Sequence, residues 1–367
     1  MAMNYPCIER RVTRQVMVGD GVIGSSAPVS VQSMTNTRTS DVAATVAQVE
    51  RLAQAGADIV RVAAASEADT AALAQIVAAS PVPIVADVHF HFARALEAIA
   101  AGCAKIRLNP GNIRDRSQVD RVIAAAADAG CAIRVGVNEG SIIDRRDADV
   151  KAAELARPIV ELMVDKMAEY LAAFEAAGFD QLVLSAKSAD PFTTVAVARA
   201  MADRWDYPLH LGVTHAGTAR TGGIRSAAAL GALLSEGIGD TIRVSLAGDP
   251  TAEVGVANEL LASLRLREPR GVRVIACPTC GRTALEVAGL ATALEDALAH
   301  IAAPLMVAVM GCVVNGPGEA EGADVAICGG GEGKVAIFVR GERTETVTDG
   351  EALAAVVAAV EKLASEG

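Results

Sequence analysis

Three cysteines and one glutamate stand in two short motifs late in the sequence. Cys277 and Cys280 form a Cys-Pro-Thr-Cys pair that follows an apolar, β-branched run. Cys312 follows a second apolar run and belongs to the segment Met310-Gly-Cys-Val-Val-Asn-Gly-Pro-Gly-Glu319. Two thiolates at Cys-x-x-Cys spacing can bind one metal centre, and the glycines leave backbone free to approach a bulky inorganic group.

Three kinds of chemistry are compatible with these residues. Structural zinc needs four ligands and would recruit Cys328 as the fourth. A thioredoxin-like dithiol also places Cys-Pro-x-Cys between a strand and a helix. An iron–sulfur cluster would use the three thiolates of Cys277, Cys280 and Cys312 with Glu319 as an unusual fourth ligand. The spacing alone leaves all three open.

The composition limits the classes of protein that can carry such a site. The chain has 367 residues, enough for a barrel of roughly 250 residues and a smaller domain. A net charge of −11 argues against binding to nucleic acid or anionic membranes. No apolar run approaches the roughly 20 residues that span a bilayer, so we expect a cytoplasmic protein. In that reducing compartment we expect the seven cysteines to be ligands or buried thiols rather than disulfides.

A repeated pattern of helix, glycine and short β-branched strand organises residues 29–264. Helices are expected to stop at Gly56, Gly102, Gly130, Gly178 and Gly237, and Ser66 with Asp69 reads as a capping box. The expected strands are 29–34, 59–63, 84–88, 105–109, 133–138, 181–187, 209–214 and 241–246. Eight strand and helix units predict a (β/α)₈ TIM barrel over residues 1–265, with a doubly wound sheet as the alternative.

Cationic side chains end several of these strands, where the ligands of such barrels bind. They are Arg61, Arg107, Arg134, Lys187 and Arg243, on five different strands. One arginine at a strand end is commonly a paired rim residue, but five would repel one another without an anion. The pattern therefore predicts a site for a dianion or polyphosphate. His215, directly after the seventh strand, is placed for substrate contact or proton transfer.

A second domain is expected over residues 270–367, after a basic linker from Arg265 to Arg273. It should contain a strand before Cys277, a helix at about 283–300, a strand before Cys312, a hairpin around Gly329–Gly333 and a final helix from Glu351. This order predicts a small α+β module that carries the cysteine motifs.

The combination of barrel and cysteine module resembles the 4-hydroxy-3-methylbut-2-enyl diphosphate synthase family of isoprenoid biosynthesis, in its two-domain bacterial form. The blocks that carry the resemblance are Val31-Gln-Ser-Met-Thr35, Ile106-Arg-Leu-Asn-Pro-Gly-Asn-Ile113, Arg134-Val-Gly-Val-Asn138, Leu234-Ser-Glu-Gly-Ile-Gly-Asp240 and both cysteine motifs. They extend over nearly the whole chain, and the segment that ends at Glu319 is the most specific.

The resemblance implies an oxidoreductase with a [4Fe–4S] cluster on Cys277, Cys280, Cys312 and Glu319. The implied reaction opens the ring of 2-C-methyl-D-erythritol 2,4-cyclodiphosphate and removes water, using two electrons delivered one at a time. Glu319 would be the exchangeable ligand and a catalytic proton donor. Flavodoxin or ferredoxin would supply the electrons, and the basic linker is a candidate docking segment.

The resemblance also implies which residues bind the substrate. The diphosphate would be held by Arg61, Arg107, Asn112, Arg134, Asn138, Lys187 and Arg243. One position departs from the family pattern, because His215 stands where an acidic residue usually follows Gly-Val-Thr. No catalytic role is assigned to it.

Two further expectations concern assembly and a rival function. The last barrel helix should run away from the ligand-binding end, and the linker is too short to return over it, so a homodimer with an active site shared between chains is expected. The rival is a barrel of phosphosugar isomerase or aldolase type with a structural zinc module, in which Lys187 would form a Schiff base.

Overall fold

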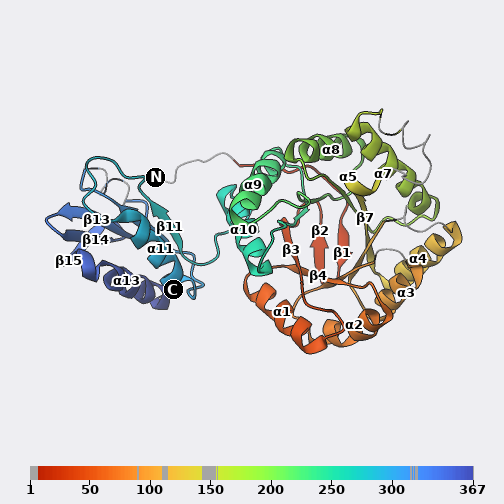
Figure 1. Cartoon of the computed structure of the whole chain (residues 1–367), viewed down its shortest axis with the longest axis horizontal. Helices are drawn as coiled ribbons and strands as arrows, with labels where there is room; N and C mark the ends of the chain where they lie inside the picture. The colour runs from red at the N-terminus through yellow and green to blue at the C-terminus, as the bar shows by residue number, and fades with distance from the viewer. Residues whose placement is uncertain are drawn as a thin grey trace. The chain divides into compact units, whose positions relative to one another are not determined.

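The computed structural model describes residues 7–88, 91–109, 115–142, 154, 156–314, 316, 318 and 321–366. The chain divides into two compact units, Met1–Arg267 and Glu268–Gly367, of which the second is blue in Figure 1. Within the described ranges, no helix is both long and apolar enough to cross a membrane.

Eight parallel strands form the sheet of the first unit. They are β3 (Ser30–Met34), β4 (Ile59–Ala63), β5 (Ile84–Asp87), β6 (Lys105–Leu108), β7 (Ala132–Asn138), β8 (Leu182–Lys187), β9 (His210–Leu211) and β10 (Thr241–Ile242). Their order is β8-β7-β6-β5-β4-β3-β10-β9, and a parallel bridge between Leu184 and Leu209 joins the two ends. The sheet therefore closes, and the predicted TIM barrel is confirmed.

Helices surround this barrel as a ring (Figure 1). They are α1 (Val42–Gln54), α2 (Glu67–Ala79), α3 (Phe92–Ala100), α4 (Arg116–Ala129), the short α5 (Glu139–Ile142), α7 (Ile159–Ala176), α8 (Pro191–Arg204), α9 (Ala219–Ser235) and α10 (Pro250–Ser263). The predicted capping box of Ser66 and Asp69 is present at the start of α2. All five predicted glycine stops have positive φ. At Gly237 a side chain would also collide with the carbonyl oxygen of Glu9.

A β-hairpin that the sequence pattern did not reveal closes the floor of the barrel. It consists of β1 (Val16–Val18) and β2 (Gly21–Ile23), paired antiparallel. Val16, Val18 and Ile23 pack on the first inward side chains of the strands, including Val85 and Ala132. Three-residue strands are too short for a periodicity signal. The apolar floor leaves the opposite end of the barrel, where the strands finish, as the end that can receive a ligand.

The last two barrel strands are shorter than predicted. The expected strands 209–214 and 241–246 are reduced to the two-residue strands β9 and β10. The backbone N–H of Arg243 still donates to the carbonyl of Leu211 at 3.0 Å, but the ladder ends there. Arg243 therefore lies just after β10 rather than inside it.

The second unit is an α+β module. Its sheet has the order β11 (Arg273–Ala276), β12 (Met306–Met310), β13 (Val325–Gly331), β14 (Lys334–Val339) and β15 (Glu342–Thr348). The first three strands are parallel and the last three antiparallel. Helices α11 (Val287–Leu298) and α13 (Ala352–Glu366) share its apolar core. Strand β15 was not predicted, because its almost wholly exposed sequence lacks apolar alternation.

Arg267 fixes the end of the barrel unit. Its guanidinium forms an ion pair with Asp58 and donates to the carbonyl of Val29 at 3.1 Å and to the Asn258 side chain at 2.9 Å. A side chain held in this way serves the barrel, so the docking role expected for the whole basic linker does not suit Arg267.

Candidate functional site

In the described part of the chain, four cations on barrel strands and Arg243, just after β10, surround one cavity at the carboxyl ends of the strands. The cavity measures about 160 Å³ and is lined by Arg61, Asp87, Arg107, Arg134, Gly136, Asn138, Ser185, Lys187, Thr214, Arg243 and Ser245. Alternation along each strand turns these side chains to the barrel interior. The structure thus brings together six of the seven residues predicted to bind substrate. The seventh, Asn112, lies outside the described residues.

The charges that line this cavity are strongly unbalanced. Among the described residues, its one lining carboxylate is that of Asp87, which lies 3.7 Å from the Arg61 guanidinium and 3.5 Å from that of Arg107. Arg134 is 3% exposed, and its Nε and Nη1 have no hydrogen-bond partner in the described part of the chain. Five cations facing one carboxylate favour an anionic ligand with at least two charges.

Burial adds to the cost of concentrating these charges. Burial, opposed by Asp87 but reinforced by Arg243 and Arg107, lowers the pKa of Arg61 to about 10. Burial and the neighbouring Arg134 lower the pKa of Lys187 well below its ordinary value. An anion in the cavity would favour the charged form of each group.

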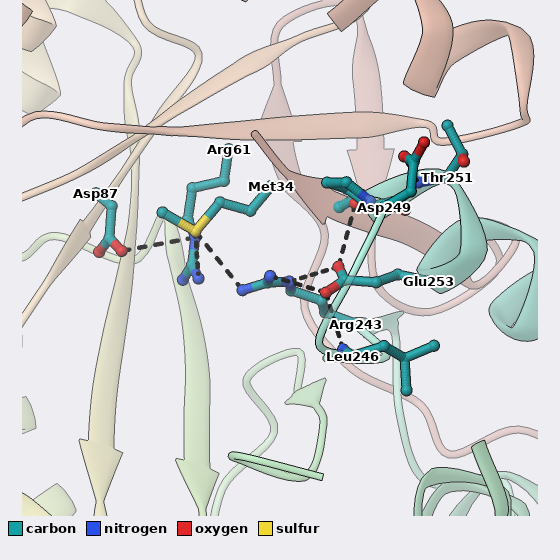
Figure 2. Close-up of polar contacts among 10 residues, drawn as sticks. Met34, Arg61, Asp87, Arg243, Leu246, Asp249, Thr251 and Glu253 are labelled. Carbon is teal, nitrogen blue, oxygen red and sulfur yellow. Dashed lines mark hydrogen bonds and ion pairs between the residues drawn. The ribbon is translucent and has the colours of Figure 1, made fainter. Parts of the chain in front are cut away.

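A carboxylate behind the cavity wall orients Arg243 (Figure 2). Glu253 is 4% exposed and accepts hydrogen bonds from Arg243 Nε and Nη2, both at 3.2 Å. It also accepts from the backbone N–H of Leu246 at 3.0 Å and from Ser33 Oγ at 3.2 Å. Sequence reasoning missed Glu253, because an acidic residue in the first turn of a helix is ordinarily explained by the helix dipole.

A methionine sulfur separates two of the arginines. Met34 Sδ lies 3.1 Å from Arg61 Nε and 3.0 Å from its Nη2, and 3.6 Å from Arg243 Nη1 (Figure 2). Sulfur is a weak acceptor that carries no formal charge. Met34 therefore holds both guanidinium groups at the cavity without neutralising either of them.

Two glycines make room for the cations. A Cβ at Gly136 would lie 3.3 Å from Arg107 Nε, and one at Gly212 would lie 2.7 Å from Lys187 Nζ. The sequence offers no signal that distinguishes such glycines from those in turns. His215, by contrast, is exposed, has a φ of 53° and does not line the cavity.

The cysteine motifs lie at one edge of the sheet in the second unit. Cys277 follows β11 and Cys312 follows β12, and these strands are parallel neighbours. The backbone N–H of Cys277 donates to the carbonyl oxygen of Val309 at 2.9 Å, and that of Cys280 donates to Thr283 Oγ1 at 2.9 Å. Cys280 is exposed, while Cys277 and Cys312 are half-buried, and none of the three forms a disulfide within the described part of the chain. Glu319 lies outside the described residues.

The two cysteine motifs meet at one sheet edge, and the part of the chain that the structure describes contains no preformed cluster of metal ligands there. Within the described ranges, no three histidine, cysteine, aspartate or glutamate side chains are close enough to hold one metal ion. Cys328, considered as a fourth zinc ligand, is buried in β13. Burial and the nearby Cys312 raise the pKa of the Cys328 thiol to about 11. The buried position of Cys328 sets it apart from Cys277, Cys280 and Cys312, which are at least partly exposed.

The ion pair between Glu253 and Arg243 generates a prediction about stability. We expect Glu253→Gln to lower the free energy of unfolding by about 3 kcal/mol, because it leaves a half-buried guanidinium without its carboxylate. Urea unfolding of the ligand-free protein measures the change. The control is Glu259→Gln, an exposed glutamate of the same helix, for which the change should stay within about 0.5 kcal/mol. Equal stability of the two variants would contradict the role given to Glu253.

Comparison with known proteins covers both units. The model of the GcpE TIM-barrel domain matches residues 13–258, and that of the GcpE protein C-terminal domain matches residues 273–362. A protein of Hyphomonas neptunium is 47% identical over 98% of this chain and 93% of its own length. A protein of Rhodospirillum rubrum is 47% identical over 99% of this chain and 94% of its own length. A protein of Zymomonas mobilis is 45% identical over 98% of this chain and 94% of its own length. All three are named 4-hydroxy-3-methylbut-2-en-1-yl diphosphate synthase (flavodoxin). With both of its units matched in order, the chain belongs to the GcpE family.

Proposed function

We propose that this protein is a 4-hydroxy-3-methylbut-2-en-1-yl diphosphate synthase. It converts 2-C-methyl-D-erythritol 2,4-cyclodiphosphate to (E)-4-hydroxy-3-methylbut-2-enyl diphosphate by reductive ring opening and loss of water. The names of relatives that share 45 to 47% of the sequence support this activity. The observation that carries it is the cavity in which five cations meet one carboxylate, since such a cavity suits a diphosphate.

The barrel unit holds the substrate by its phosphates. Arg61, Arg107, Arg134, Lys187 and Arg243 neutralise the diphosphate, and Asn112 and Asn138 donate further hydrogen bonds. Arginine suits this task because its planar guanidinium can form two parallel hydrogen bonds with a phosphate. Glu253 keeps the Arg243 guanidinium in one orientation before the ligand arrives, which reduces the entropy lost on binding.

The second unit holds the redox group on Cys277, Cys280, Cys312 and Glu319. The donor set fits an iron–sulfur cluster of the [4Fe–4S] type, because the three cysteines are at least partly exposed and follow two neighbouring strands, and thiolates are the usual ligands of such clusters. Such a cluster would supply the two electrons of the reductive ring opening one at a time. Glu319 would be the exchangeable ligand beside three thiolates, and after it moves aside it would take up a proton from solvent and deliver that proton to the leaving oxygen.

Flavodoxin is the electron donor that the names of the relatives support. The reducing conditions of the cytoplasm would keep all three ligand thiols available. A phosphosugar isomerase or aldolase with a zinc module finds no support among these relatives.

Anaerobic purification followed by a turnover assay tests the function. We expect a brown protein that contains iron and acid-labile sulfide and that converts the cyclic diphosphate when reduced flavodoxin is supplied. A colourless protein that binds one zinc ion per chain and does not convert the substrate would refute the proposal.

The four ligands should differ in their effect on the cluster. We predict that Cys277→Ser and Cys312→Ser each lose the cluster, whereas Glu319→Ala keeps much of it and loses most turnover, because three thiolates can retain a cluster without the carboxylate. Iron and sulfide content and the visible spectrum measure retention, and turnover is measured in parallel. Cys131→Ser, a buried cysteine of the barrel unit, serves as the control. Complete cluster loss in a folded Glu319→Ala protein would make the carboxylate structurally essential.

The protein acts as a homodimer in which each active site uses residues of both chains. A mixture of Arg243→Ala and Cys312→Ser subunits tests this, because in-trans assembly puts both lesions at one site and none at the other. Mixed dimers should then regain up to about half of the wild-type activity. Mixing Arg243→Ala with Arg134→Ala is the control and should give no recovery. No recovery in demonstrated Arg243→Ala and Cys312→Ser heterodimers would assign each active site to a single chain.

A further inference from the structure

Lys105 is a buried lysine to which the proposed function gives no role. It is the first residue of β6, and strand alternation turns it to the same interior face as Arg107. Its neighbours in the ladder are Val85 and Ala132, which belong to the apolar layer packed on the hairpin floor. Lys105 does not line the cavity. It therefore lies between the floor and the cations that surround the ligand site.

The ammonium group of Lys105 has an unfavourable environment. The side chain is fully buried, and its Nζ has no hydrogen-bond partner in the part of the chain that the structure describes. The groups that act on it are Arg134 of β7, Arg61 of β4 and the thiol of Cys131. Burial, Arg134 and Arg61 lower the pKa of Lys105 to about 7, and the Cys131 thiol opposes them only weakly as the last of the contributing groups.

The other elements around the interior supply mainly cations or their neutral forms. Lys187 of β8 and Arg243 after β10 line the cavity, as do Arg107 of β6 itself and the carboxylate Asp87 of β5. His210 of β9 is fully buried, and burial together with Lys187 lowers its pKa well below the ordinary value. Arginines keep their protons at neutral pH, so the amines are the groups that respond to crowding by losing theirs.

We propose that Lys105 is a positioning residue that takes up a proton when a diphosphate enters the cavity, and so adds positive charge beneath the ligand without touching it. This inference rests on the proposed function for the identity of the ligand. The observation that carries the proposal is geometric. The buried Nζ of Lys105 has no hydrogen-bond partner among the described residues, and Lys105 stands two residues before Arg107, which lines the cationic cavity. In the empty site Lys105 is neutral, which removes one positive charge from the crowded interior. Lys105 becomes charged again when a ligand with two negative charges binds.

The sign of the pH dependence follows from this scheme. Below about pH 7, Lys105 is already charged in the free protein, so binding takes up no proton there. Bound anion favours the ammonium and raises the pKa of Lys105. Between the free and the bound pKa, binding takes up as much as one proton, and the affinity must fall as the pH rises.

The test compares wild-type protein with Lys105→Met, which has a similar length and no charge, and with Lys105→Gln as a second neutral variant. The cyclic diphosphate is the ligand, because each of its phosphates retains only a strongly acidic group and does not titrate near neutral pH. Calorimetry in two buffers of different ionisation enthalpy counts the protons, and the dissociation constant is measured across the pH range. Lys166→Met, on the outer helix α7, is the matched control.

We expect the wild-type Kd to rise above about pH 7 more steeply than that of either variant, by up to about tenfold per pH unit. The variants should also take up as much as one proton fewer, while Lys166→Met behaves like the wild type. Parallel pH curves and equal proton counts in wild type and Lys105→Met would overturn the inference. If Lys105 had only a structural role, its substitution would change thermal stability and leave the pH dependence of the Kd unaltered.

Failure of the proposed function would look different. If the wild-type protein does not bind the cyclic diphosphate, the ligand is wrong, and inorganic pyrophosphate becomes the probe for the same comparison. Because pyrophosphate itself titrates, only the difference between wild type and variant is then interpreted. A difference in that case supports proton uptake by Lys105, and its absence refutes it.

Discussion

Repulsion between like charges at the carboxyl ends of the barrel strands is the constraint to which the rest of the barrel site responds. Among the described residues, four cations on barrel strands and Arg243, just after β10, share a cavity of about 160 Å³ with one lining carboxylate. At the few ångströms that separate such groups, each uncompensated pair costs on the order of kilocalories per mole even at an effective dielectric constant of about 20. The folded barrel must supply stability elsewhere to hold this arrangement without its ligand.

The chain limits that repulsion in ways that keep the cavity positive. Glu253 neutralises Arg243 from behind the wall, and Met34 offers an uncharged sulfur to two guanidinium groups. Gly136 and Gly212 leave space for Arg107 and Lys187. None of these contacts places a second carboxylate in the lining. An anion in the cavity would balance these charges, and the stability of the barrel would then depend on occupancy of the site.

Much of this could be predicted from the sequence, because strong local rules apply. Glycine stops and β-branched runs indicated eight units, and alternation indicated which cations face inward. The missed elements lack such rules. Strands β1 and β2 are too short to show a period, and β15 is polar along its length because it is an exposed edge strand. Glu253 and Lys105 each have ordinary explanations in the sequence, as a helix-start acid and as the first residue of a strand. Their roles depend on burial and on neighbours distant in sequence, which only the closed barrel brings together.

The hairpin floor limits the routes by which a ligand can enter and leave the barrel. In the described part of the chain, β1 and β2 cover the amino ends of the strands with apolar side chains, of which Val16, Val18 and Ile23 are at most 1% exposed. The hairpin therefore closes the cavity at the amino ends of the strands, and a ligand can enter it from the carboxyl ends. Substrate must enter and product must leave by the same route, so each turnover has to empty the chamber before the next can begin. A ligand held in the cavity would therefore have to leave by the carboxyl end of the barrel before the next one could bind.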